Sequence, residues 1–366
     1  MKLNITLKPI LLATVLMAGF SSCKKDKMPD IVPGPVSTLG VYVLNEGYFS
    51  MANNRANSSI SYYDVTSKLV EKDYFRKQNG TDLGFNANDL QQYGSKLYCV
   101  VTGTTPEAKD SYVEVMSTAT GKSLKRISFS DDKVGFLPRY VLFYKNKAYV
   151  SSYDGKIAKV DTASLTIDSR IAVGGALEQM AIVNNKLYVA NSDHFMYRTS
   201  NNASISVVDL NTFTKLKDIP VPINPTRISA TTSGDLFVVT RGVYNGALPT
   251  LTKVSSVTDT KISENDKINI EFLTINANSA FAIGDYTNPF LNVFTVASGT
   301  VGLKFITDAT DVKNPYGVTV NTLDKDVFVG DSGASKFFCF GADGKNKFSF
   351  ETGDMPKLAA FRYGYK

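Results

Sequence analysis

Aromatic, amide and charged side chains gather in several loops that directly follow short apolar runs of the sequence. Rings can stack on a ligand, while carboxylates, amides and guanidinium groups fix its orientation. Such loops suit a large, partly apolar ligand that bears amides or phosphate, and we expect them to form one binding face. The predicted ligand-binding residues are Glu46, Tyr48, Phe49, Arg139, Tyr153, Gln179, His194, Tyr197, Arg241, Tyr244, Asp285, Tyr286, Tyr316 and Asp331.

Two of these residues have an alternative role. Arg139 and Arg241 could bind a phosphate through the guanidinium fork, or either could close a salt bridge between neighbouring parts of the fold. We predict no resident cofactor and no structural metal site, because one histidine and three cysteines are too few for most zinc centres.

Motifs of the common enzyme classes are absent from the sequence. It contains no Gly-x-Ser-x-Gly elbow, P-loop, His-Glu-x-x-His motif or dinucleotide fingerprint. Four acids, Glu46, Glu178, Asp285 and Asp331, could meet on a common axis and hold calcium. We therefore expect a protein that is not an enzyme, with a metal-dependent hydrolase or lyase as an alternative.

The elements that position these loops repeat along the chain. A short apolar run with an aromatic residue, such as 187–191, leads through a loop to a second run that ends in aspartate, such as 204–209. The aromatic residue recurs every 39 to 56 residues, at positions 42, 98, 149, 188, 237, 281 and 328. Seven copies of this length, each with room for four short strands, predict an all-β fold, a seven-bladed β-propeller. The aspartates at 64, 161 and 209 recur at one position of the repeat and are predicted to cap turns.

Prolines mark the strands that we expect to lie innermost in their blades, where a missing N–H donor is tolerated. They are Pro138, Pro225, Pro315 and Pro356. No strand follows the run that begins at Pro356, and none precedes the first blade, which starts at Val41. The C-terminal strand is therefore predicted to complete blade one and close the ring, with the propeller spanning residues 39–366.

The N-terminal residues have the pattern of a targeting signal. A basic start, an apolar stretch over 9–20 and the small residues before Cys23 are typical of a bacterial lipoprotein signal, predicted over 1–22. Cys23 is then the lipid-bearing residue, and 23–38, with three prolines and several lysines, is a tether. No later segment is apolar enough to cross a membrane, so lipid alone would anchor the protein. Cys99 and Cys339 each lie in a strand-like run, and we expect two separate buried thiols.

The blade motifs resemble a known family. The runs 42–45 and 188–191 are similar to the Tyr-Val-Thr-Asn repeats of bacterial surface-layer propellers. The segments 43–49, 59–64 and 75–80 resemble the Bacteroidota seven-bladed lipoproteins that capture vitamin B12 at the cell surface. This resemblance implies non-enzymatic capture of a corrinoid or similar nutrient for a TonB-dependent transporter at the outer membrane. It also makes His194, the only histidine, a candidate axial ligand of cobalt, whereas a single loop histidine is more often simply solvated.

The composition limits the other partners. A net charge of +6, spread along the chain, is unlike the basic patch of a nucleic-acid binder, so no nucleic-acid partner is expected. A closed ring leaves no open sheet edge to pair, and a monomer is predicted. A propeller that binds protein or glycan, as an accessory subunit or adhesin, stays open as the second alternative.

Overall fold

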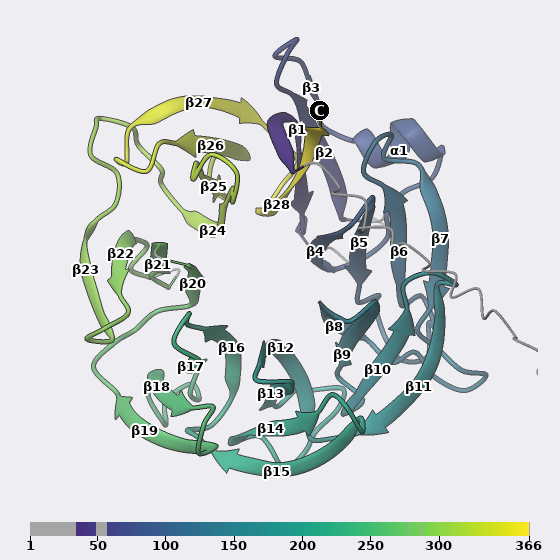
Figure 1. Cartoon of the computed structure of the whole chain (residues 1–366), viewed down its shortest axis with the longest axis vertical. Coiled ribbons are helices and arrows are strands. Elements are labelled where there is room, and N and C mark those ends of the chain that lie inside the picture. The colour runs from purple at the N-terminus through teal and green to yellow at the C-terminus, as the bar shows by residue number, and fades with distance from the viewer. Residues whose placement is uncertain (1–33, 49–56, 278, 286, 366) are drawn as a thin grey trace, which may run out of the picture.

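The computed structural model describes residues 34–48, 57–277, 279–285 and 287–365. Seven four-stranded antiparallel sheets stand around a central axis as the blades of a propeller (Figure 1). The predicted fold class is thus confirmed. The predicted signal segment, Cys23 and most of the tether lie outside the described residues, and these interpretations stay predictions.

Each blade runs from an inner strand at the axis to an outer strand at the rim. Blade 1 contains β28 (Pro356–Tyr365), β1 (Pro35–Asn45), β2 (Ser59–Asp64) and β3 (Val70–Glu71). Blade 2 contains β4 (Ala87–Tyr93), β5 (Lys96–Val101), β6 (Tyr112–Ser117) and β7 (Ser123–Ser128). Blade 3 contains β8 (Pro138–Tyr144), β9 (Lys147–Ser152), β10 (Lys156–Asp161) and β11 (Thr166–Ala172). Blade 4 contains β12 (Ala176–Val183), β13 (Lys186–Ser192), β14 (Ser204–Asp209) and β15 (Thr214–Pro220).

The remaining blades follow the same order. Blade 5 contains β16 (Pro225–Ala230), β17 (Asp235–Thr240), β18 (Thr250–Ser255) and β19 (Thr260–Asn265). Blade 6 contains β20 (Phe272–Asn276), β21 (Ser279–Ile283), β22 (Leu291–Thr295) and β23 (Thr300–Lys304). Blade 7 contains β24 (Pro315–Val320), β25 (Val327–Asp331), β26 (Lys336–Phe340) and β27 (Asn346–Glu351).

The two ends of the described chain meet in blade 1. The C-terminal strand β28 pairs antiparallel with β1, with Val41 opposite Phe361 and Val43 opposite Ala359 (yellow beside purple in Figure 1). This pairing confirms the predicted closure of the ring. Strand β1 begins at Pro35, inside the segment assigned to the tether, because β28 extends to Tyr365 and pairs with it there.

The repeated aromatic residues form the packing between blades. All seven lie in second strands and are at most 5% exposed. Tyr188 also donates a hydrogen bond of 2.6 Å from its hydroxyl to Asp259 of blade 5, so it ties two blades together. The motif that repeats most clearly in the sequence therefore builds the scaffold and does not itself form a site.

Turn chemistry follows the sequence closely. The carboxylates of Asp64, Asp161 and Asp209 each accept hydrogen bonds from backbone N–H groups two or three residues further on, as predicted for turn caps. Cys99 and Cys339 are both buried and unpaired, which confirms the prediction of two separate thiols.

One short helix, α1 (Tyr74–Asn79), was not predicted. It begins at the Asp73 cap and ends at Gly80, whose φ of 72° favours glycine. Its six residues are too few to show a helical period in the sequence. Within the described part of the chain, no helix is long and apolar enough to cross a membrane.

Candidate functional site

Most inner strands carry a β-bulge at the same place, close to their N-terminal ends. In blades 1, 2, 3, 4, 5 and 7 the pairing of the inner strand with its neighbour shifts there, whereas β20 of blade 6 pairs without a shift. A bulge turns a side chain out of the regular alternation of a strand. The residues at these shifts include Asn88, Arg139, Glu178, Thr226, Tyr316 and Lys357.

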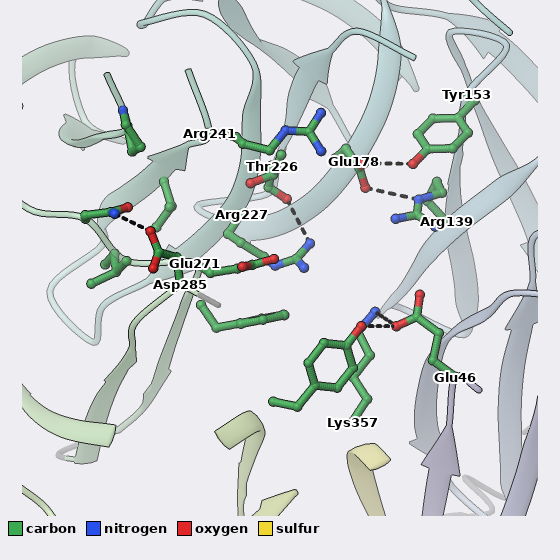
Figure 2. Close-up of a pocket in the computed structure, with 16 residues that line it drawn as sticks. Glu46, Arg139, Tyr153, Glu178, Thr226, Arg227, Arg241, Glu271, Asp285 and Lys357 are labelled. Atoms are coloured by element: carbon green, nitrogen blue, oxygen red, sulfur yellow. Dashed lines mark hydrogen bonds and ion pairs between the residues drawn. The ribbon is translucent and has the colours of Figure 1, made fainter. Parts of the chain in front are cut away.

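These bulges surround a cavity of about 350 Å³ on the propeller axis (Figure 2). Every bulge residue named above except Asn88 lines it. Loops and strand starts of blades 5 and 6 complete the wall. Their contributions are Arg227, Val239, Arg241, Pro249, Asn269, Ile270, Glu271, Phe272 and Asp285, and Glu46 and Tyr153 join them from blades 1 and 3.

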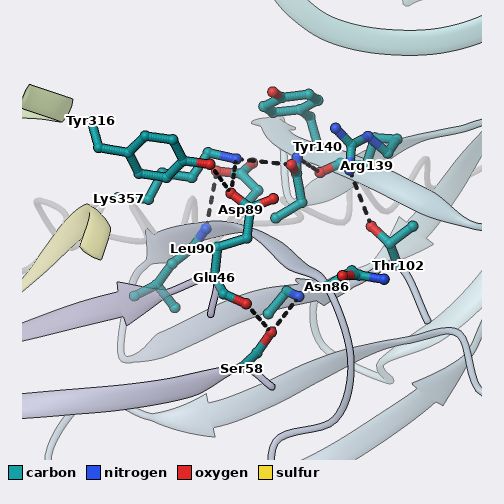
Figure 3. Close-up of polar contacts among 12 residues, drawn as sticks. Glu46, Ser58, Asn86, Asp89, Leu90, Thr102, Arg139, Tyr140, Tyr316 and Lys357 are labelled. Atoms are coloured by element: carbon teal, nitrogen blue, oxygen red, sulfur yellow. Dashed lines mark hydrogen bonds and ion pairs between the residues drawn. The ribbon is translucent and has the colours of Figure 1, made fainter. Parts of the chain in front are cut away.

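A chain of polar contacts links the blades on one side of this axial cavity (Figure 3). Glu46 accepts hydrogen bonds from the Tyr316 hydroxyl at 2.7 Å and the Lys357 ammonium at 3.1 Å. Lys357 also donates to Asn88 Oδ1 at 2.9 Å, and Asn88 Nδ2 donates to the Arg139 carbonyl oxygen at 2.6 Å. Blades 7, 1, 2 and 3 are thereby joined by paired polar groups.

An ion pair extends this series of polar contacts to blade 4. Arg139 Nε lies 3.1 Å from Glu178 Oε2, and the two side chains are 14% and 9% exposed. The Tyr153 hydroxyl donates to the other oxygen of Glu178 at 2.9 Å, and the Arg139 guanidinium lies 4.7 Å from the centre of the Tyr153 ring. The salt bridge between blades, one of the two roles foreseen for Arg139, is therefore present in the structure.

The two carboxylates in this series of polar contacts, Glu46 and Glu178, are held in their charged form. Burial alone would raise the pKa of the Glu178 carboxyl, but the nearby Arg139 and Arg227 lower it below its ordinary value. Burial likewise opposes the charge on Glu46, and Lys357 with the Tyr316 hydroxyl brings the pKa of that carboxyl below its usual range. Both carboxylates are thus committed to partners on the protein.

Blade 5 contributes two arginines that, unlike Arg139, form no ion pair among the described residues. Among the described residues, no carboxylate oxygen lies within 4 Å of the Arg227 or Arg241 guanidinium groups, whereas the bridge between Arg139 and Glu178 is direct. Arg227 packs on the Phe272 ring, 4.5 Å from its centre, and donates from Nη1 to the Tyr140 hydroxyl. Arg241 is exposed at the cavity wall.

A second pocket of about 270 Å³ adjoins the axial cavity and shares Glu46, Arg139 and Tyr153 with it. His194 lines this side pocket, and its ring stacks on Tyr153 with centres 4.1 Å apart. Burial, followed by the charge of Arg139, lowers the pKa of His194 to about 4, so the ring is neutral at pH 7. His194 is therefore packed at the site, unlike a freely solvated loop histidine.

Several predicted residues line neither pocket but lie in the loops around them. Tyr48 is 58% exposed, and its hydroxyl donates to the Ser332 carbonyl oxygen at 3.2 Å. Tyr244 is 96% exposed in the loop after β17. Tyr197 donates to the Gly135 carbonyl oxygen at 2.7 Å and packs against Tyr153, so it holds the loop over blade 3.

Three predicted residues hold the scaffold. Gln179 accepts from the Ile228 backbone N–H at 3.0 Å and braces blade 4 against blade 5; it does not line the axial cavity but lines a neighbouring pocket of about 70 Å³. Asp331 is fully buried, and its carboxylate accepts from backbone N–H groups of its own blade. Asp285 reaches the cavity wall, but its carboxylate accepts from the Thr287 hydroxyl, which is the main reason that its pKa is lowered, and from backbone N–H groups of the same loop. Phe49 and Tyr286 fall outside the described residues.

Three of the four acids considered for calcium line the axial cavity, but among the described residues they do not form a cluster that could hold the ion. Glu46 and Glu178 have basic partners, and Asp285 and Asp331 are engaged by their own loops. No group of three or more metal-ligating side chains occurs in the part of the chain that the structure describes.

Important members of the site are not among the residues predicted from the sequence. Arg227, Glu271, Phe272 and Lys357 line the axial cavity but were not in the predicted set. A signal existed for Lys357, because it follows an inner-strand proline, as do Arg139 and Tyr316, which were predicted. No comparable pattern marks the strand starts of blade 6.

Residues 39–330 match the family described as a domain of unknown function, DUF5074. The chain belongs to the DUF5074 family. None of the curated proteins compared with this DUF5074 chain matches it.

Solved structures resemble this DUF5074 chain in fold. The periplasmic gluconolactonase PpgL of Pseudomonas aeruginosa is 12% identical, with a TM-score of 0.60 over 89% of this chain and 100% of its own. A putative 6-phosphogluconolactonase of Bacteroides fragilis is 12% identical, with a TM-score of 0.59 over 88% of this chain and 98% of its own. A second one, from Bacteroides uniformis, is 9% identical, with a TM-score of 0.61 over 88% and 100%. At these identities the likeness concerns the fold alone.

Proposed function

We propose that this DUF5074 protein is a non-enzymatic capture protein that binds its ligand in the axial cavity and the adjoining side pocket. The observation that carries the proposal is the ring of bulges, which aims one side chain after another from different blades at a single cavity. A rigid scaffold that points polar groups into one concave site is typical of ligand binding.

The chemistry of the wall supports binding over metal-dependent hydrolysis. Ligand groups would meet the ring of Phe272, the hydroxyl of Tyr316 and several guanidinium groups. The cavity carboxylates of Glu46 and Glu178 are each paired with a basic residue, and Asp285 is engaged by its own loop. This arrangement leaves little free carboxylate for calcium, which prefers six to eight oxygen ligands.

The finer part of the proposal comes from the sequence. The leader with Cys23 supports a lipoprotein, and the family resemblance supports its place at the outer membrane, displayed at the cell surface. The resemblance to vitamin B12 capture propellers makes a corrinoid the first ligand to test, and a TonB-dependent transporter the partner that receives it. A corrinoid is larger than either pocket, so it would rest on the rim and place only part of itself in the cavity.

The exposed rim favours one alternative. Tyr244 and Phe195 are 96% and 66% exposed, and such rings can stack on sugar rings or contact a protein. A glycan- or protein-binding propeller therefore remains the second candidate.

Titration of the full-length chain in mild detergent with cyanocobalamin, followed by calorimetry, tests the proposed ligand. We expect tight binding that weakens when Phe195 or Tyr244 is changed to alanine. Leu303→Ala is the matched control, because Leu303 is 86% exposed but lies on the outer strand β23. An absence of binding at tens of micromolar would reject the corrinoid, and glycans would then be tested in the same way.

The non-enzymatic part needs its own measurement. The protein is incubated with glucono-δ-lactone, and acid release is followed at constant pH. We expect the rate to equal that of buffer alone, and a faster rate that saturates with substrate would contradict the proposal.

A further inference from the structure

The charges around the axial cavity are unevenly paired. On the side of blades 7, 1, 2, 3 and 4, each basic group has a carboxylate partner: Lys357 contacts Glu46, and Arg139 contacts Glu178. On the side of blade 5, Arg227 and Arg241 have none within 4 Å among the described residues. Figure 2 shows both arginines directed into the cavity.

Arg227 is fixed in one orientation. Its guanidinium lies on the Phe272 ring at 4.5 Å, and its Nη1 donates to the Tyr140 hydroxyl and, at 3.4 Å, to the Thr226 carbonyl oxygen. No hydrogen bond of the described residues uses its Nε or Nη2. These two nitrogens form the edge of a guanidinium that binds a carboxylate or phosphate through two parallel hydrogen bonds.

Arg227 lies where two pockets adjoin. Arg227, Phe272 and Lys357 line both the axial cavity and a narrower pocket of about 70 Å³ next to it. Lys357 is 4% exposed and already bonded to Glu46 and Asn88. Of the two basic groups that these pockets share, Lys357 thus uses two of its three donors and is buried, whereas Arg227 keeps a whole edge of two unused donors.

Three acids of the cavity wall oppose an anion here: Glu178, which is already paired with Arg139 and also interacts with the charge of Arg227, and two acids on blade 6. Asp285 is engaged by its own loop and by an N–H of Asn269. Glu271 is exposed on the cavity wall and has no ion-pair partner among the described residues. Glu271 would compete with an anionic ligand for the charge of Arg227.

We propose that Arg227 binds an oxyanion of the ligand, a carboxylate or a phosphate, through its Nε and Nη2 edge, with Arg241 adding positive charge at the cavity wall. This inference rests on the proposed function, because it names the chemical class of ligand that the same site takes. The fork is preoriented: the guanidinium is planar by its own resonance, and packing on the Phe272 ring holds it in place.

The test uses three probes that differ in charge: glucose 6-phosphate, gluconate and neutral glucose, each titrated into the full-length chain in mild detergent. Inorganic phosphate is the fourth probe and reports a free ion without an organic part. We expect at least one anion to bind more tightly than glucose. Binding of the phosphates alone would identify a phosphate site, and binding of gluconate alone would identify a carboxylate site.

Three variants decide whether Arg227 is responsible. Arg227→Gln should weaken the anion by about tenfold or more, as expected for a lost hydrogen bond to a charged group. Glu271→Gln should strengthen it, because a competing carboxylate is removed. Lys217→Gln is the matched control: it removes one positive charge from the exposed outer strand β15 and should change nothing.

The outcomes separate this inference from the proposed function. The inference is overturned if no anion binds at millimolar concentration, if glucose binds as well as the anions, or if Arg227→Gln, folded by circular dichroism, binds anions like the native chain. Cyanocobalamin binding that persists in those cases would leave ligand capture intact. Anion binding without cyanocobalamin binding would reject the corrinoid alone.

Discussion

The ion pair between Arg139 and Glu178 gives the sharpest prediction for stability. Both side chains are largely buried, at 14% and 9% exposure, and the two charged atoms are 3.1 Å apart. The change Glu178→Gln keeps the shape of the side chain but leaves the guanidinium uncompensated between two blades. Removing one partner of a buried pair costs about 3–5 kcal/mol. We expect the lower end, roughly 3 kcal/mol, because Arg139 retains its contact with the Tyr153 ring and faces a cavity that admits water.

Urea denaturation followed by far-ultraviolet circular dichroism measures this loss, and tyrosine fluorescence gives a second probe because the chain has no tryptophan. The control is Glu351→Gln, which breaks the pair with Lys72 at 2.6 Å, where the side chains are 64% and 56% exposed. This control should leave the denaturation midpoint unchanged, since surface pairs contribute little. Equal midpoints for Glu178→Gln and the native chain would refute the burial argument.

A double variant tests the cause of the loss. Arg139→Met combined with Glu178→Gln leaves no unpaired charge, so we expect it to be more stable than Glu178→Gln alone. The pH dependence has a definite sign as well. Because the pKa of Glu178 is lowered on folding, its stabilising effect is present at neutral pH and is lost as the pH falls below about 4.5 and through the folded pKa. Glu178→Gln should remove this part of the acid sensitivity.

Three further predictions concern the ring closure, the thiols and the histidine. Phe361→Ala should lower the free energy of unfolding by about 3–5 kcal/mol, because Phe361 is 6% exposed and packs on Phe328; an unchanged urea midpoint would contradict a closing strand β28. Cys99 and Cys339 should resist iodoacetamide at pH 8 until the chain is unfolded, because burial raises both thiol pKa values; peptide mapping that finds either one alkylated in the native protein would contradict their burial. His194, in protein freed of any histidine tag, should titrate near pH 4 by nuclear magnetic resonance, so that stability decreases as the pH falls from about 6.5 toward about 4; a pKa near 6.5 would mean that its ring is not packed on Tyr153.

The fold could be predicted because the signal repeats. One buried aromatic residue per blade, such as Tyr42 or Tyr188, marks the same strand of each blade. The closing strand followed from a proline-led run at Pro356 without a partner in sequence. Both inferences need only the order of strands, which the sequence contains directly.

The site was only partly predictable, because side-chain direction depends on bulges. Arg139 and Tyr316 were expected at the axis and do line the cavity. Gln179 and Asp331 have equally polar side chains, but local geometry turns them into braces of the scaffold. Arg227 was missed because its value as a site residue lies in the lack of a direct ion pair, with no carboxylate oxygen within 4 Å among the described residues. The pairing of charges across blades cannot be read from residue types and spacing.

The most direct test of the axial cavity as a binding site for anionic ligands is a crystal structure of the protein soaked with tungstate, a tetrahedral oxyanion. We predict an anomalous difference peak beside the Arg227 guanidinium in the native protein and its loss in Arg227→Gln. A cavity without such a peak while tungstate binds elsewhere, or a peak that persists in Arg227→Gln, would contradict the assignment.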